Sequence, residues 1–144
     1  MTVASICQRT VDTVRPTETA YAAAQRLASR CVGSLVVVDD HDRPIGMLTD
    51  RDLALRIVAA GCDPQTSVGD IMSGEPTVIT EHALVDEAIV CMRERGVRRL
   101  PVVDEQGRLV GIVSLEDVLA RLAREMAHVG GFVQRTAPAR LATS

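Results

Sequence analysis

The sequence contains no lysine, no asparagine and no tryptophan among its 144 residues. Without lysine, neither a Schiff-base enzyme nor a P-loop of the GxxxxGK[ST] type can form. One tyrosine, Tyr21, and one phenylalanine, Phe132, are too few for the aromatic platforms that bind single-stranded nucleic acid. The net charge of -3 also lacks the basic excess of nucleic-acid-binding proteins. We therefore expect no nucleic-acid partner.

Long apolar runs and a secretory leader are also missing. The uninterrupted apolar runs are short, such as Leu35 to Val38, whereas a membrane-spanning helix needs about 20 apolar residues. The first ten residues lack a basic start followed by an apolar stretch. We therefore expect a cytoplasmic protein with no membrane partner. Hydrophobic residues make up 47% and charged residues 24%, the composition of one ordinary globular domain.

The four cysteines, Cys7, Cys31, Cys62 and Cys91, include no CxxC pair, and the three histidines are scattered. An even number of cysteines without a leader favours reduced thiols over a disulfide framework. A zinc site or a Cys–His nucleophile would have to be assembled by the fold, because no ligand spacing is present. We expect no metal, no required cofactor and no catalytic residue.

The sequence is two copies of one unit, offset by 65 residues. When Thr2 to Ile57 is aligned without a gap to Ser67 to Leu122, 13 of the 56 pairs are identical, against roughly 5 expected by chance. Most of the remaining apolar positions are conservative pairs, such as Leu48 with Val113. Duplication of an ancestral unit is the simplest explanation.

Each copy predicts the same order of elements, β-α-β-β-α. A short extended stretch precedes a helix, a hairpin of two buried strands follows, and a second helix closes the unit. Acidic residues and glycine between the strands are typical of turns. The expected segments are 12–15, 20–30, 35–38, 44–48 and a helix from Thr49 to near Gly61, then 76–80, 84–95, 100–103, 109–113 and a helix from Ser114 toward His128.

A unit of about 60 residues buries both faces of its own small sheet poorly. We therefore expect a mixed α+β (α/β) fold in which two β-α-β-β-α repeats pack sheet to sheet about a pseudo-twofold axis, with symmetric clefts between them. Repeat 1 is expected at 1–61, a linker at 62–66 and repeat 2 at 67–129. The tail at 130–144 has no clear periodicity, so we expect it to be flexible or to lie on a neighbouring subunit.

A motif of the form G-h-h-[ST]-x-x-D, where h is apolar, stands at a strand-to-helix junction of each copy. The glycine permits close backbone approach, and the hydroxyl and the helix N-terminus offer donors to an anion. The aspartate can accept two hydrogen bonds from a ribose diol. The same spacing is also a capping box, and the two roles are compatible. The residues are Gly46, Thr49 and Asp52 at the first junction and Gly111, Ser114 and Asp117 at the second.

The doubled unit, the strands LVVVD and LPVVD and the two junctions resemble a tandem pair of cystathionine-β-synthase (CBS) domains, a Bateman module, over about Val3 to Ala123. The resemblance implies a sensor that binds adenine nucleotides or adenosyl compounds, such as AMP, ADP, ATP or S-adenosylmethionine, between the repeats. It also implies a homodimer. For the site, it implies that Thr49 and Ser114 contact phosphate, that Asp52 and Asp117 hold ribose, and that adenine meets the backbone near Val14 and Ile79.

The two copies differ just before the central strand, where Gly33 and Ser34 in the first match Arg98 and Arg99 in the second. In the family that the sequence resembles, basic residues at this place clamp phosphate. We expect the pseudo-twofold axis to bring both arginines to the first junction, where Arg51 adds a third. The second junction would then receive only Gly33 and Ser34. The alternative is that the arginines merely solvate an edge.

The sequence therefore predicts a non-catalytic, adenine-nucleotide-sensing module that acts through a homodimer or an unknown effector protein. The alternative is a ligand-free structural or interaction protein of the stress-response type. An enzyme is disfavoured, because the sequence offers only scattered Cys and His as base or nucleophile. Dimerisation is expected through apolar residues of each copy's second helix: Leu53, Ile57 and Val58 in the first, Val118, Leu119 and Leu122 in the second.

Overall fold

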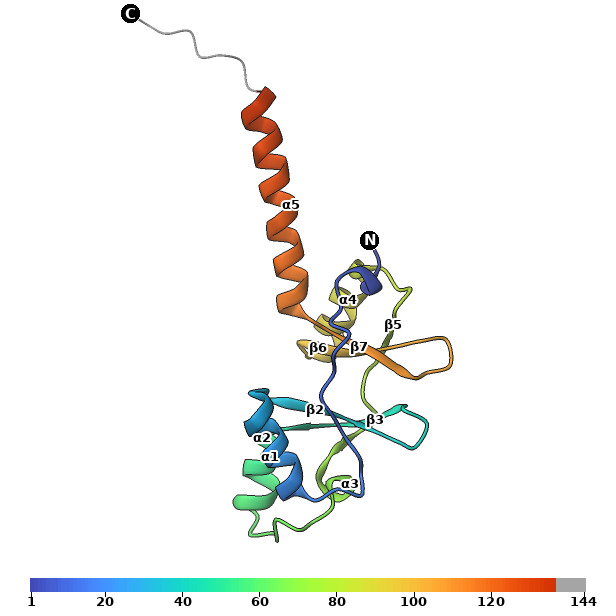
Figure 1. Cartoon of the computed structure of the whole chain (residues 1–144), viewed down its shortest axis with the longest axis vertical. Helices are drawn as coiled ribbons and strands as arrows, with labels where there is room; N and C mark the ends of the chain where they lie inside the picture. The colour runs from blue at the N-terminus through green and yellow to red at the C-terminus, as the bar shows by residue number, and fades with distance from the viewer. Residues whose placement is uncertain (137–144) are drawn as a thin grey trace, which may run out of the picture.

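The computed structural model describes residues 1–136 and contains one sheet for each repeat, the two sheets lying one above the other (Figure 1). In both sheets a short early strand runs parallel to a central strand, which forms an antiparallel hairpin with the next. The predicted α+β repeat order is therefore confirmed. The first sheet has the order β1 (Thr13–Val14), β2 (Ser34–Val38), β3 (Pro44–Thr49), β4 (Ser73–Gly74), and the second β5 (Ile79–Thr80), β6 (Arg99–Val103), β7 (Leu109–Ser114).

Two helix ends have the caps that the sequence predicts. The Thr19 hydroxyl accepts a hydrogen bond from the Ala22 amide at 3.1 Å and so caps the first long helix. Gly96 ends the equivalent helix of repeat 2 with a φ of 66°, a left-handed conformation that suits glycine. The helices are η1 (Val3–Ser5, 3₁₀), α1 (Ala20–Arg30), α2 (Asp50–Leu53) continuing into the π-helical turn η2 (Ala54–Val58), α3 (Val68–Ile71), α4 (Val85–Arg95) and α5 (Leu115–Thr136).

Helix α5 is longer than the sequence predicts. It passes through Gly130 and Gly131 and ends at Thr136, so residues 130–136 are helical, whereas the sequence shows no clear periodicity there. Glycine lowers helix propensity but, unlike proline, removes no hydrogen bond, so two glycines do not break the helix. The rest of the expected tail, 137–144, lies outside the described residues. Within residues 1–136 no helix is both long and apolar enough to cross a membrane.

Each repeat has its own hydrophobic core, built from equivalent positions of the hairpin. Leu35, Val37 and Leu48 are fully buried in the first core, and Leu100, Val102 and Val113 are fully buried in the second. These strands are apolar on both faces because one face packs on the helices of the same repeat and the other faces the second sheet.

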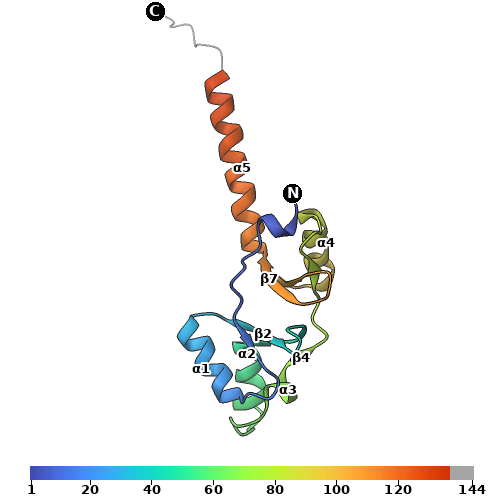
Figure 2. The same ribbon diagram turned by 45° about the vertical axis from the view of Figure 1, so that its right-hand side comes forward.

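The first turns of the two repeats are exchanged. Val3 is fully buried in the core of repeat 2, and its amide donates to the Ala83 carbonyl at 2.8 Å. Val68 is fully buried in the core of repeat 1, and its amide donates to the Glu18 carbonyl at 2.8 Å. Figures 1 and 2 both show the N-terminal segment beside α4 before it descends to the first sheet. Neither repeat is therefore complete without a segment of the other.

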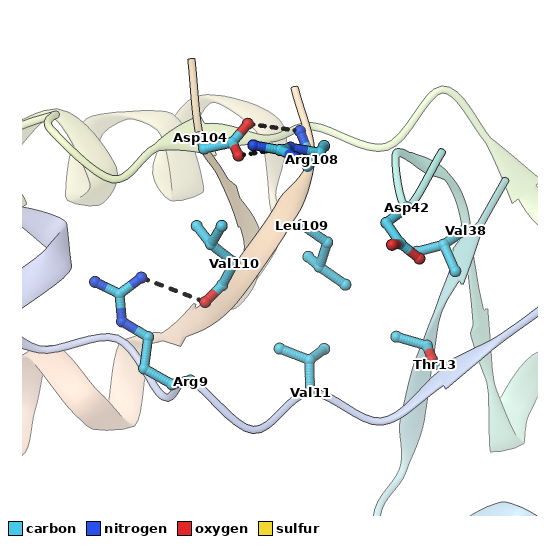
Figure 3. A pocket seen from close by; sticks show the side chains of 9 residues that line it. All are labelled: Arg9, Val11, Thr13, Val38, Asp42, Asp104, Arg108, Leu109 and Val110. Atoms are coloured by element: carbon cyan, nitrogen blue, oxygen red, sulfur yellow. Dashed lines mark hydrogen bonds and ion pairs between the residues drawn. The ribbon is translucent and has the colours of Figure 1, made fainter. Parts of the chain in front are cut away.

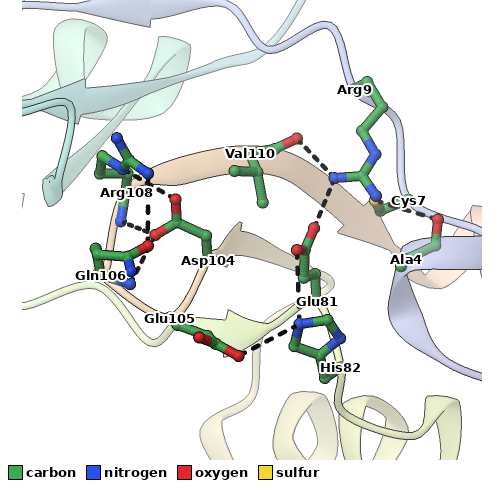
Figure 4. A network of polar contacts seen from close by, with 10 residues as sticks. All are labelled: Ala4, Cys7, Arg9, Glu81, His82, Asp104, Glu105, Gln106, Arg108 and Val110. Atoms are coloured by element: carbon green, nitrogen blue, oxygen red, sulfur yellow. Dashed lines mark hydrogen bonds and ion pairs between the residues drawn. The ribbon is translucent and has the colours of Figure 1, made fainter.

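A polar network fixes the exchanged N-terminal segment on repeat 2 (Figure 4). The Arg9 guanidinium donates to the Glu81 carboxylate at 3.0 Å and to the Val110 carbonyl at 3.4 Å. Upstream, the Cys7 thiol donates to the Ala4 carbonyl at 3.9 Å. Burial raises the pKa of the Cys7 thiol, which keeps it protonated at neutral pH. The segment therefore crosses repeat 2 in a defined register.

At both junctions a neighbouring segment of the chain passes so close to the glycine that a larger residue would not fit. A Cβ on Gly111 would lie 2.9 Å from the Gln8 carbonyl oxygen and 3.0 Å from the Cys7 sulfur. A Cβ on Gly46 would lie 2.5 Å from the Met72 sulfur, at the equivalent place in repeat 1. The close backbone approach expected from the motif is present, but the approaching backbone belongs to the chain itself.

Candidate functional site

A cleft of about 230 Å³ lies between the repeats at the second junction. It is formed by the segment that enters β1, by the turn that enters β2, and by the end of β7 with the start of α5. Elements of both repeats contribute, as expected for a cleft on the pseudo-twofold interface. The lining residues are Gln8, Thr10, Val11, Asp12, Cys31, Val32, Gly33, Ser34, Val36, Arg99, Ile112, Ser114 and Asp117.

Asp117 lines this cleft and also caps α5. One of its carboxylate oxygens, Oδ2, accepts from the Ser114 amide at 2.9 Å, and the Ser114 hydroxyl accepts from the Asp117 amide at 3.1 Å. The other oxygen, Oδ1, accepts from the Gln8 side-chain amide at 3.1 Å. A carboxylate has about four acceptor sites in all. Asp117 therefore keeps acceptor capacity for a ligand while it caps the helix.

Arg99 is the one basic side chain among the residues that line the cleft. It pairs with Ser114 in the register of β6 and β7, which places it at the mouth of the junction. Its Nη1 donates to the Ser34 hydroxyl of the other repeat at 3.2 Å. A guanidinium has five donors, so this one bond leaves the rest free for an anion in the cleft.

The arginines thus lie differently from the sequence prediction. Gly33 and Ser34 line the cleft of the second junction as expected, but the expectation that this cleft receives no arginine is wrong for Arg99. Arg98 instead donates to the Glu116 carboxylate at 2.5 Å, within its own repeat. A hydrogen bond from its own backbone and then the Arg98 charge hold the pKa of Glu116 below its usual range. Arg98 is therefore paired within its own repeat, whereas Arg99 lines the cleft between the repeats.

At the first junction the Asp52 carboxylate has a cationic neighbour within the chain. Asp52 accepts from the Thr49 amide at 3.0 Å in the equivalent capping box, and its second oxygen lies 3.7 Å from Arg56 Nη2. The side chain of Met72 packs over Gly46 at the same junction. Arg51 lies on α2 and is exposed. The carboxylate of Asp52 thus faces a cation, whereas that of Asp117 faces a neutral amide.

The side chains of Val14 and Ile79 belong to the two hydrophobic cores, where their exposed fractions are 1% and 9%. The part of the early segment that lines this cleft is 10–12, immediately before β1. An adenine contact with the backbone near Val14 and Ile79 stays a prediction. Val11, Val36 and Ile112 form an aliphatic slot, with no aromatic side chain among the lining residues.

A second, wider cavity of about 460 Å³ lies between the turns of the two hairpins (Figure 3). It also contains basic side chains, but both are paired. Arg108 Nε donates to the Asp104 carboxylate at 2.9 Å, and Arg9 is bound to Glu81 and to the Val110 carbonyl. Its arginines are less available to an anion than Arg99 is, so the smaller cleft is the better candidate site.

The cysteines and histidines form no metal-ligating cluster in the described part of the chain. All four cysteines are free. Across residues 1–136, no group of three or more His, Cys, Asp or Glu side chains is arranged to hold a metal ion. Cys31 lines the cleft, with a φ of 53° at the C-terminus of α1.

Both repeats match the family model of the CBS domain, at residues 3–59 and 68–124. The chain therefore belongs to the CBS-domain family, and its fold is that of a CBS pair. Protein MK0525 of Methanopyrus kandleri is 40% identical over 120 residues, which cover 83% of this chain and 61% of that protein. Hypoxic response protein 1 of Mycobacterium tuberculosis is 41% identical over 106 residues, which cover 73% of each.

Solved CBS pairs have the same fold. The structure of Hypoxic Response Protein I with two coordinated zinc ions superposes with a TM-score of 0.76 at 38% identity, covering 83% of this chain and 98% of that one. The CBS pair of MJ0100 in complex with 5′-methylthioadenosine and S-adenosyl-L-methionine gives 0.76 at 26%, covering 87% and 98%. CBSX2 in complex with AMP gives 0.73 at 28%, covering 88% and 98%.

Proposed function

We propose that this CBS pair is a non-catalytic sensor of adenine nucleotides or adenosyl compounds and that the ligand binds in the cleft of the second junction. The observation that carries the proposal is the convergence of Arg99 and Asp117 on a cleft with an aliphatic slot, where the second carboxylate, Asp12, is paired with Arg30 at 2.7 Å. Two CBS pairs of the same fold were solved with adenosyl ligands, one with AMP and one with 5′-methylthioadenosine and S-adenosyl-L-methionine.

Each part of a nucleotide has a partner in this cleft. The two free acceptor sites of the Asp117 carboxylate suit the two hydroxyls of ribose. The guanidinium of Arg99 suits a phosphate, which it can bind through two parallel hydrogen bonds. The slot formed by Val11, Val36 and Ile112 suits the two faces of a purine, and the backbone of 10–12 lies beside it.

The size of the cleft favours a small ligand. Its volume of about 230 Å³ lies just below the roughly 300–1,000 Å³ usual for ligand sites. A mononucleotide or nucleoside fits such a cleft better than a dinucleotide does. Arg99 is the one cation among the lining residues, so a second or third phosphate would have no further cation to bind. We therefore expect AMP to bind at least as tightly as ATP.

A catalytic role is not proposed, because the cleft offers one cysteine and no histidine among its lining residues. The module instead signals through an unidentified effector protein or through a homodimer. The helices carry apolar residues that suit self-association: Val58 is 79% exposed and Leu119 is 54% exposed, whereas the neighbouring Ile57 and Val118 are buried.

A ligand-free interaction protein is the second candidate, and the first junction favours it. There one oxygen of the Asp52 carboxylate lies 3.7 Å from Arg56, so the chain itself already supplies a cationic partner to that carboxylate. If the second cleft behaves in the same way, no adenine compound will bind.

Thermal unfolding of the full chain with AMP, ADP, ATP, adenosine and S-adenosylmethionine in parallel separates the two candidates. A ligand present at 100 times its dissociation constant adds about 2.7 kcal/mol to the folded state, which raises the melting temperature by roughly 5–10 °C. We expect AMP to produce such a shift. No shift with any of the five compounds would favour the interaction protein.

A further inference from the structure

Helix α5 continues far beyond the CBS pair. Figures 1 and 2 show that after its first turns it stands clear of both sheets and of the other helices. Val118 is its one buried residue, and every residue from 126 to 136 is exposed. A helix of 22 residues is about 33 Å long at 1.5 Å per residue, and its second half, 126–136, is exposed among the described residues.

The exposed part of α5 carries a regular apolar stripe. Apart from Phe132, its exposed large apolar residues follow one another at intervals of 3, 4, 3 and 4 residues from Leu119, the heptad spacing of positions a and d in a coiled coil. Met126 is 75% exposed and Val129 is 62% exposed, so the stripe faces solvent in the single chain. Its residues, which we call the α5 seam, are Leu119, Leu122, Met126, Val129 and Val133.

The seam has to be covered for the helix to persist. The exposed part of α5, 126–136, is shorter than the roughly 12–15 residues below which an isolated helix is marginally stable in water. Gly130 and Gly131 lower the helix propensity of the last turns further, since glycine is the least favourable residue there after proline. Contiguous exposed apolar patches of this kind mark interaction surfaces.

We propose that the α5 seam binds the α5 seam of a second copy of this chain and that the two helices form a coiled coil. The heptad period is the reason for this partner, because knobs-into-holes packing needs a second helix with the same 3.5-residue period. In residues 1–136 the next longest helices, α1 and α4, have 11 residues each. A second copy supplies an identical helix through an isologous contact.

The charges on α5 are compatible with self-pairing. The positions that flank the seam are mostly uncharged: Ala123 and Gly130 on one side, Glu125 and Phe132 on the other. Glu125 is in turn paired with Arg121 at 3.2 Å. The remaining arginines of the extension, Arg124 and Arg135, lie on the outer face, away from the seam. Two copies therefore meet without a row of like charges, and Ala123 and Gly130 allow the helices to approach closely.

Sedimentation equilibrium of the full chain tests the proposal, with hydrogen exchange of residues 126–136 as a second measurement. The test variant is Met126→Glu in the seam, and its matched control is Gln134→Glu on the outer face, since both add one negative charge to an exposed position of the same helix. We expect the unchanged chain and the control to be dimers at micromolar concentration with protected amides. Met126→Glu should raise the dimer dissociation constant at least about tenfold and remove the protection.

Three outcomes would overturn the proposal. One is a monomeric unchanged chain, and another is a Met126→Glu dimer as tight as the control. The third is a monomeric chain that binds vesicles of anionic lipid through the seam, which would assign the apolar stripe to a membrane surface. None of these depends on nucleotide binding, so the sensor function and the coiled coil fail independently.

Discussion

Arg99 and Ser34 occupy equivalent positions in the two repeats, 65 residues apart, and they are joined to each other by a hydrogen bond of 3.2 Å. Two equivalent residues can touch only where they lie close to the pseudo-twofold axis. The axis therefore passes beside this pair, and the two repeats are chemically unequal at that point. A cation extends from repeat 2, whereas repeat 1 contributes a hydroxyl.

Replacing Arg99 should weaken the binding of phosphorylated ligands and leave that of uncharged ligands almost unchanged. Arg99→Ala is expected to weaken AMP binding about tenfold or more, because a hydrogen bond to a charged group is worth roughly 1.5–3 kcal/mol. Adenosine, which has no phosphate, should bind the variant almost as well as the unchanged protein. Calorimetric titration with both ligands measures the difference.

Arg98→Ala is the matched control for Arg99→Ala. Arg98 is the neighbouring residue, and its guanidinium is bound to Glu116 on the exposed side of α5. We expect its loss to leave AMP affinity at the second junction nearly unchanged. Equal losses in both variants would show that the two arginines act through overall charge, and the split between their tasks would be wrong.

The junction glycines should matter for stability rather than for binding chemistry. Gly111→Ala forces a Cβ to within 2.9 Å of the Gln8 carbonyl oxygen and 3.0 Å of the Cys7 sulfur. Overpacking against a backbone typically costs about 1–3 kcal/mol. Gly74→Ala is the control, since a Cβ there meets nothing within 4 Å. Urea unfolding should show the loss for Gly111→Ala alone, and equal midpoints would contradict the exchange of segments.

Much of this fold could be predicted because its signals are local. The hairpins, the caps at Thr19 and Gly96 and the repeat of 65 residues all follow from residue type and spacing. The exchange of Val3 and Val68 could not be predicted, because an apolar residue in a first turn suits either core equally well. Only the three-dimensional path of the chain decides which core it joins.

Only part of the candidate site could be predicted, because only part of it has a local signal in the sequence. The two capping boxes have a sequence signature, so Asp52 and Asp117 could be found. The position of Arg99 depends on where the pseudo-twofold axis lies, which no spacing reveals. The adenine is expected beside the backbone near Val14; the cleft is lined by the residues two to four positions earlier, and the Val14 side chain lies in the core, so the backbone contact stays a prediction.

The free energy of unfolding should decrease in acid, partly because one ion pair of repeat 1 is lost. Arg26 holds the Glu18 carboxylate with two hydrogen bonds of 2.7 and 3.0 Å and keeps the pKa of Glu18 below its usual range. This contribution is present above the ordinary glutamate pKa of about 4.3 and is lost as pH falls through the lower folded value. Glu18→Gln should therefore cost on the order of 0.5–1 kcal/mol at pH 7.

The cost of Glu18→Gln should shrink as the pH is lowered below about 4. Urea unfolding at pH 7 and at pH 3.5 measures it, and the exposed Glu94→Gln serves as the control for removing a carboxylate. A cost that stays constant over this range, or grows in acid, would show that the ionised pair is not its source.

Folding should need neither zinc nor a disulfide. All four cysteines are free, and the described residues contain no cluster of metal-ligating side chains, although a related CBS pair was solved with two zinc ions. Chelator and reductant together should leave the melting temperature unchanged. A drop of several degrees would mean that a metal or a thiol bond stabilises the folded state.

The most direct test of the sensor site compares AMP binding by Asp117→Asn and Asp52→Asn in calorimetric titrations of the full chain. Both substitutions remove one charge from equivalent capping boxes, so their effects on binding separate the two junctions. We expect Asp117→Asn to weaken AMP binding about tenfold or more and Asp52→Asn to change it by less than about threefold. Loss of AMP binding in Asp52→Asn with full binding in Asp117→Asn would contradict the assignment of the ligand to the second junction.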